Sequence, residues 1–163
     1  MHSFPYGGQS GGKKRVIVYE TGDIIDILLQ SQRLSTCNRG RVAAVIRLPN
    51  DDTACVVGYS HSMTDETCDT DGHELDNAGG HCVRTIHAEV MAIAKAASMG
   101  LSTCGSTCYV TRLPCESCIR ALRCANVRRV VVYETVEETE QEWQDRKVYA
   151  QRLGVLLQSY KHR

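Results

Sequence analysis

The spacing of apolar residues near the start of the chain predicts an amphipathic helix over Asp23–Leu34. Ile24, Ile27, Leu28 and Leu34 recur at intervals of three, one and six residues, which places them along one side of a helix. The intervening positions are mostly polar. A helix of this kind packs its apolar side against a larger element.

Two apolar runs come next and predict a pair of strands. Arg41–Leu48 contains the sequence VAAVI, which is typical of a buried strand, and Ala54–Tyr59 is a second such run. The residues Pro49–Asp52 between them favour a turn. We therefore expect an antiparallel hairpin.

The remainder of the chain alternates between helical and strand patterns after a long polar stretch. Ser60–Thr85 is rich in Asp, His, Cys and Gly and predicts a loop, which at this length is usually functional or disordered. Beyond it, helices are expected at His87–Ala97, Cys115–Ala125 and Glu137–Leu153, and strands at Thr107–Arg112, Val127–Glu134 and Val155–Gln158.

This order of elements predicts an α/β fold with three layers, in which helices cover both faces of a mixed, five-stranded sheet. We expect one domain over residues 15–163, because the chain has the length of a single domain and a sizeable core. Residues 1–14 contain the run GGQSGG and are expected to form a flexible tail.

The composition of the chain limits the classes of binding partner and the cellular compartment that we expect. Nineteen basic and nineteen acidic residues cancel, so the chain has no overall attraction for nucleic acid or a membrane surface. No apolar run approaches transmembrane length. The nine cysteines are odd in number and come without a signal peptide. They favour reduced thiols and metal ligands in the cytoplasm over a secreted disulfide framework.

One split pattern carries the chemistry: His87-Ala88-Glu89, followed by Pro114-Cys115-Glu116-Ser117-Cys118. An imidazole and two thiolates suit tetrahedral zinc, and three protein ligands leave the fourth position open for water, as in catalytic sites. Cys115 and Cys118 are spaced to lie one turn apart near the start of a helix, where thiolates are favoured. Glu89 stands apart from the ligands and is the candidate proton shuttle.

A structural or redox role is the alternative for an isolated C-x-x-C. Structural zinc sites normally have a fourth protein ligand, often from a second C-x-x-C, and this chain has no second C-x-x-C. A zinc-stabilised binding module without activity is a further alternative. The presence of Glu89 argues against it, because a structural site has no need of that carboxylate.

The pattern H-x-E followed by P-C-x-x-C is the known signature of the zinc deaminases, and the chain resembles their deoxycytidylate (dCMP) deaminase branch, within the cytidine deaminase superfamily, from about Ile24 to Val155. The matching segments are Ser35–Arg39, Val42–Ile46, Gly58-Tyr59, His81–Glu89, Tyr109–Thr111, Pro114–Cys118 and Val130–Tyr133. His81–Glu89 is the most specific of them for this branch.

The resemblance implies a cytidine-deaminase-like fold and a hydrolase acting on a cyclic amidine. It implies one catalytic zinc per chain on His87, Cys115 and Cys118, with Glu89 as the proton shuttle. The implied reaction converts dCMP to dUMP with release of ammonia. The implied assembly is a homo-oligomer, a hexamer or a dimer, and a Mg²⁺-nucleotide effector of an allosteric enzyme is a candidate ligand.

Two departures from the family pattern concern the substrate. Ser60 stands where the family usually has an asparagine that holds the sugar, and Met91 stands where an asparagine usually follows the catalytic glutamate. Other cytosine nucleotides or nucleosides, including dCTP and modified bases, therefore remain alternatives. Met91 is also common in tRNA adenosine deaminases. The balanced charge argues against that class and against single-stranded DNA, whose binding needs a positive groove.

Further residues are candidates for a second metal and for substrate. Some dCMP deaminases have a second, structural zinc, and the candidate ligands here are Cys37, Cys68, His73, His81 and Cys82. Cys37, Cys68 and His81 are the expected ligands among them, with the fourth ligand left open. The alternative is that Cys82 is a buried small residue and the histidines are solvated.

Arginine offers a forked set of donors for a phosphate, and the arginines that could bind one are Arg39, Arg41, Arg84 and Arg112. The candidates for substrate binding are Arg84, Arg39 and Ser60.

Overall fold

The computed structural model describes residues 24–49, 54–76, 80–133 and 137–160. The expected tail (1–14) and the turn around residues 50–52 lie outside them. The helices are α1 (Ile24–Gln32), α2 (Cys68–Asp71), α3 (Ala88–Ser98), α4 (Glu116–Cys124) and α5 (Glu140–Arg152). The strands are β1 (Ala43–Arg47), β2 (Cys55–Tyr59), β3 (His61–Ser62), β4 (Thr85–Ile86), β5 (Thr107–Val110), β6 (Arg129–Val132) and β7 (Leu156–Ser159).

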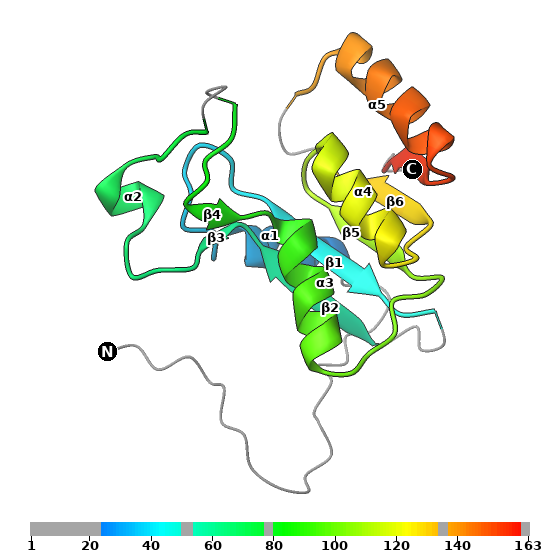
Figure 1. The fold of residues 1–163 in the computed structure, drawn as a ribbon, viewed down its shortest axis with the longest axis horizontal. Helices are drawn as coiled ribbons and strands as arrows, with labels where there is room; N and C mark the ends of the chain where they lie inside the picture. The colour runs from blue at the N-terminus through cyan, green and yellow to red at the C-terminus, as the bar shows by residue number, and fades with distance from the viewer. Residues whose placement is uncertain (1–23, 50–53, 77–79, 134–136, 161–163) are drawn as a thin grey trace, which may run out of the picture.

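The main sheet has the strand order β2-β1-β5-β6-β7 and is mixed, as expected (Figure 1). β1 pairs antiparallel with both β2 and β5, whereas β5, β6 and β7 are parallel. The predicted β1–β2 hairpin is therefore confirmed. Parallel neighbours need crossover connections, which α4 and α5 supply between β5, β6 and β7.

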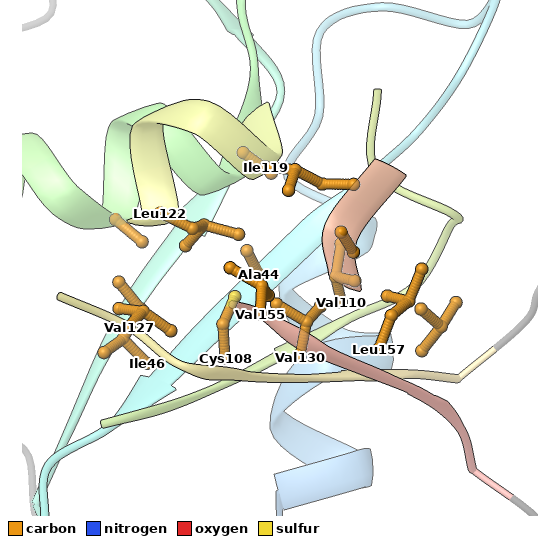
Figure 2. Close-up of a cluster of buried hydrophobic side chains, with 14 of the residues drawn as sticks. Ala44, Ile46, Cys108, Val110, Ile119, Leu122, Val127, Val130, Val155 and Leu157 are labelled. Atoms are coloured by element: carbon orange, nitrogen blue, oxygen red, sulfur yellow. The ribbon is translucent and has the colours of Figure 1, made fainter. Parts of the chain in front are cut away.

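Side chains alternate across the sheet and separate two apolar clusters. Ala44 and Ile46 of β1 point into the larger cluster, beneath α3, α4 and α5, where Figure 2 shows Ile119 and Leu122 of α4 above the strands. Ala43 and Val45 point into the other cluster, against α1. Helices on both faces of the sheet confirm the three-layer α/β class.

The segment expected to be a long loop contains more structure than its polarity suggested. β3 and β4 pair with each other as a small second sheet, and α2 lies between them in sequence. Thr67 caps α2 by accepting a hydrogen bond from the backbone amide of Thr70. Elements of two to four residues are too short to produce a periodic pattern, which is why the sequence did not indicate them.

Candidate metal centre and active site

The start of α3 holds the first ligand and the carboxylate. β4 leads directly into His87, which is the extended N-cap residue of α3 (φ −70°, ψ 145°), and Glu89 is the second residue of the helix. Ala88 and Ala92 are fully buried against the sheet, so this end of α3 is fixed in position. His87 and Glu89 therefore lie at the first turn of the helix, as predicted.

The start of α4 holds the two thiols. Cys115 is its N-cap residue in extended conformation, Pro114 before it is buried, and Cys118 lies one turn later with 1% of its surface exposed. The amide of Ile119 donates to the carbonyl of Cys115 at 3.0 Å, which closes that turn. Both sulfur atoms therefore sit at a helix N-terminus, where partial positive charge favours thiolate.

These two helix starts bring His87, Cys115 and Cys118 together. The Nδ1 atom of His87 is 3.2 Å from the Sγ of Cys118 and 3.6 Å from the Sγ of Cys115. Zinc bonds of about 2.3 Å to sulfur and 2.0 Å to nitrogen at tetrahedral angles place such ligand atoms about 3.5–3.8 Å apart. The donor set and its spacing therefore fit a zinc ion.

The pKa values of the two thiols, Cys115 and Cys118, are shifted in opposite directions. A hydrogen bond from Cys118, together with one from His87, lowers the pKa of Cys115 to about 3. The pKa of Cys118 is raised, because Cys115 accepts its hydrogen bond and because Cys118 is buried. The lowered pKa favours the thiolate form of Cys115, whereas Cys118 keeps its proton. A zinc ion that displaced this proton would be bound by two thiolates and one imidazole.

Glu89 is buried beside this group, with 3% of its surface exposed. Burial raises the pKa of its carboxyl above the ordinary value. A carboxyl with a raised pKa can both accept and donate a proton near neutral pH, which is what a shuttle requires.

A pocket of about 270 Å³ opens onto the group. Of the residues expected to bind substrate or metal, it is lined by His87, Glu89, Cys115, Arg39, Ser60, His81 and Cys37. It is also lined by Arg112, Glu138, Glu142 and Arg146. The last three gave no signal in the sequence, because they belong to a charged helix and its approach, which resemble a solvated surface.

Two residues expected to bind substrate, Arg84 and Ser60, form bonds with other protein groups. Arg84 forms an ion pair with Glu66 and lines a different pocket, so it lies outside the walls of the pocket beside Glu89. The hydroxyl of Ser60 is 2.6 Å from that of Ser35, accepts from the amide of Val42 at 3.1 Å and donates to the carbonyl of Gly40 at 3.2 Å. Ser60 lines the pocket, but these bonds use its hydroxyl to hold the 35–42 segment.

A second metal-ligating group lies next to the pocket. The Sγ atoms of Cys37, Cys68 and Cys82 and a ring nitrogen of His73 lie within 4.8 Å of one another. The structure thus brings Cys37 and Cys68 together as expected, with His73 and Cys82 as companions. It places His81 elsewhere: its ring lies 5.4 Å from that of His87, on the pocket side.

Protonation in this second group is also divided. Burial and the neighbouring thiols raise the pKa of Cys68 to about 12. Burial also acts to raise the pKa of Cys82, but hydrogen bonds from His73 and Cys68 outweigh it and bring that pKa to about 6. Three thiols and one imidazole make a complete tetrahedral set of the structural kind.

No helix in the described part of the chain is long and apolar enough to cross a membrane. All nine cysteines are free thiols in the structure.

Comparison with known proteins adds sequence evidence to this geometry. Residues 22–134 match the family model described as the cytidine and deoxycytidylate deaminase zinc-binding region. ComE operon protein 2 of Bacillus subtilis (strain 168) is 35% identical over 101 residues, which are 61% of this chain and 51% of that protein. The deoxycytidylate deaminase of Enterobacteria phage T2 is 40% identical over 60 residues, which are 37% of this chain and 32% of that protein.

The chain thus spans about half or less of the length of these curated relatives. Among solved structures, the dCMP deaminase of cyanophage S-TIM5 in complex with dCMP and dUMP matches with a TM-score of 0.67 at 22% identity. That match covers 85% of this chain and 95% of the phage chain. At this identity the match shows the fold.

The family model covers more than two thirds of the chain and includes both helix starts that carry the metal-ligating residues. Together with the shared fold, this shows that the chain belongs to the cytidine and deoxycytidylate deaminase family.

Proposed function

We propose that the protein is a zinc-dependent hydrolytic deaminase of a cytosine nucleotide, with dCMP as the substrate and dUMP and ammonia as the products. The observation that carries this proposal is the convergence of His87, Cys115 and Cys118 near the buried carboxyl of Glu89, at a pocket that His87, Cys115 and Glu89 line. The names of the curated phage relatives support the choice of dCMP.

The residues have distinct roles in this reaction. His87, Cys115 and Cys118 would hold the zinc ion, which supplies an activated water as nucleophile when bound. Glu89 would carry a proton from the attacking water to the ring nitrogen of cytosine and then assist the departure of ammonia. Its burial keeps bulk water from competing for the proton.

Arg39 lines the pocket beside Glu89, which supports a role for it in binding the phosphate. A guanidinium group can donate two parallel hydrogen bonds to phosphate oxygens. We assign the phosphate to Arg39 in place of Arg84, because Arg84 lines a different pocket.

The function is tested by replacing Glu89. The wild-type protein should convert dCMP to dUMP with loss of absorbance and release of ammonia. Glu89→Gln should lower kcat by about 10²- to 10⁴-fold, because it removes the proton carrier, while the zinc content stays the same. Glu116→Gln, which changes an exposed carboxylate on α4, serves as the matched control. A wild-type protein that turns over no cytosine nucleotide would contradict the proposal.

We also propose a second, structural zinc on Cys37, Cys68, His73 and Cys82. Four ligand atoms within 4.8 Å and a thiol whose pKa falls to about 6 support it. A closed set of four protein ligands leaves no position for water, which is typical of structural sites. Metal analysis of the purified protein should give two zinc ions per chain, and a single ion would contradict this site.

The resemblance to dCMP deaminases supports two further proposals: a cytoplasmic homo-oligomer and a Mg²⁺-nucleotide effector. Light scattering should give a mass several times that of one chain. A mass of one chain at micromolar concentration would contradict the assembly.

A further inference from the structure

Arg112 occupies an unusual position in the pocket wall. It lies two residues after the end of β5 and three residues before Cys115, so the rigid sheet and the metal-binding helix fix its backbone on both sides. Its Nε atom donates to Oε1 of Glu138 at 3.0 Å. The Glu138 side chain is only 10% exposed, and both residues line the pocket beside Glu89.

The far end of the same guanidinium lies against the segment that carries Arg39. A Cβ atom built at Gly40 would be 3.0 Å from Nη1 of Arg112, so the absence of a side chain there makes room for the guanidinium. Two arginines from distant parts of the sequence, Arg39 and Arg112, thus contribute to one pocket wall.

The hydrogen bond to Glu138 leaves part of the guanidinium for a ligand. Because Nε is the donor, the edge formed by the two Nη groups is not used in that bond. Phosphate accepts two parallel bonds from such an edge. The same pocket is lined by the carboxylates of Glu138 and Glu142, whose charges oppose negative charge beyond the first phosphate, and by Arg146.

We propose that Arg112 and Glu138 together select nucleotides with a single phosphate. Arg112 binds the 5′-phosphate of the nucleotide, and Glu138 positions the guanidinium while repelling the β- and γ-phosphates of a triphosphate. This assignment rests on the proposed deaminase function and specifies how that site distinguishes dCMP from deoxycytidine and from dCTP.

The test measures kcat and KM on deoxycytidine, dCMP and dCTP for matched variants. Arg112→Gln should lower the dCMP-to-deoxycytidine ratio of kcat/KM by about tenfold or more, mainly through the KM for dCMP, because one charged phosphate contact is lost. Arg112→Lys should restore part of the ratio. Glu138→Gln, which keeps an acceptor but removes the charge, should raise kcat/KM for dCTP relative to dCMP by about tenfold.

Arg129→Gln is the matched control. Arg129 also donates from Nε to a side-chain oxygen at 3.0 Å, that of Gln158, but it is exposed and does not line the pocket. It should change neither ratio. If Arg112→Gln left the dCMP-to-deoxycytidine ratio unchanged, or Glu138→Gln left the dCTP-to-dCMP ratio unchanged, this selection mechanism would be wrong.

These outcomes separate the mechanism from the function on which it rests. A wild-type protein that deaminates dCMP but shows unchanged ratios in the variants overturns only the selection mechanism. Absence of turnover on all three substrates overturns both. A purely structural ion pair would lower stability and kcat on all substrates alike, without the change confined to KM for the phosphorylated one.

Discussion

At the scale of single residues, each candidate metal-binding group contains one thiol with a lowered pKa beside one with a raised pKa. Cys115 and Cys82 have pKa values lowered to about 3 and about 6, whereas their neighbours Cys118 and Cys68 have raised values. In each group one sulfur is ready to meet a cation and another keeps its proton until the cation arrives. Zinc binding to either group should therefore release protons.

Two of the three histidines in the 60–85 segment, His73 and His81, provide a residue-scale prediction. His73→Ala should reduce the zinc content from two ions per chain to one, because it removes a ligand of the second group. His81→Ala should leave two ions, since its ring lies with His87 on the pocket side. Metal analysis by mass spectrometry measures both. Loss of an ion in the His81 variant, with retention in the His73 variant, would reverse the assignment.

At this scale, the sequence indicated the residues of the H-x-E and P-C-x-x-C pattern more reliably than the residues of the second metal group or of the substrate pocket. The catalytic pattern was predictable because H-x-E and P-C-x-x-C each lie within one helix turn, where spacing determines which side chains share a face. His73 and His81 lie in a segment without periodicity, so spacing could not distinguish them. Arg84 was expected at the substrate because it lies close to His87 in sequence, but its side chain is bound to Glu66.

At the scale of elements, α3 lies unusually close to β2. A Cβ atom at Gly58 would be 2.1 Å from the carbonyl oxygen of Ala88 and 2.6 Å from the amide nitrogen of Ala92, both backbone atoms that cannot give way alone. The contact fixes α3, and with it His87 and Glu89, against the sheet. Glycine is required here for close packing.

Gly58→Ala should therefore lower the free energy of unfolding by about 3 kcal/mol, because α3 must move away from β2. Urea unfolding measures the change. Gly80→Ala is the control, since a Cβ there meets nothing within 4 Å. Equal stability of the two variants would show that the β2–α3 contact is not as tight as described.

The start of α5 provides a pH-dependent prediction. Glu142 accepts hydrogen bonds from the amide and the hydroxyl of Thr139 at 2.8 and 2.7 Å, completing a capping box. The bonds from Thr139 lower the pKa of Glu142 below its ordinary value of 4.5. A lowered folded-state pKa means that the charge stabilises the fold above pH 4.5 and ceases to do so as the pH falls through the folded-state value.

Glu142→Gln keeps an acceptor for Thr139 but removes the charge. The wild-type protein should have the higher Tm at pH 7, and the difference should begin to shrink near pH 4.5 and vanish at lower pH. Thermal unfolding followed by circular dichroism between pH 3 and 7 measures it. A Tm difference that stays constant over this range would contradict a role for the charge.

The longer elements were predictable because each has several turns or several alternating residues. The helix that follows Pro114 was expected at Cys115–Ala125 and is found at Glu116–Cys124. The last strand was expected at Val155–Gln158 and is found at Leu156–Ser159. β3, α2 and β4 were missed because pairs of residues carry no period. Their positions depend on contacts with distant segments, such as the hydrogen bond from Cys68 to the carbonyl of Thr36.

At the scale of the whole molecule, the sheet order explains where the chemistry is placed. α3 and α4 cover the same face, so the helix starts that carry His87 and Cys115 meet, although 28 residues separate them in sequence. The alternation of elements was sufficient to predict this mixed, three-layer arrangement. Arg39 and Arg112 were candidates for phosphate binding from their side-chain chemistry, but Glu138 was not predictable as part of the pocket wall, because only tertiary packing brings its segment to the other two.

Cys37 and Cys82 belong to the second group of ligands and also line the pocket, and only five positions separate Cys82 from His87. The two proposed metal sites thus share a wall. A chelator titration followed by activity alone would therefore not distinguish loss of the proposed catalytic ion from loss of the proposed structural ion. Metal-exchange experiments on this protein should follow occupancy at each site separately, for instance through the absorption bands of cobalt bound to two or to three thiolates.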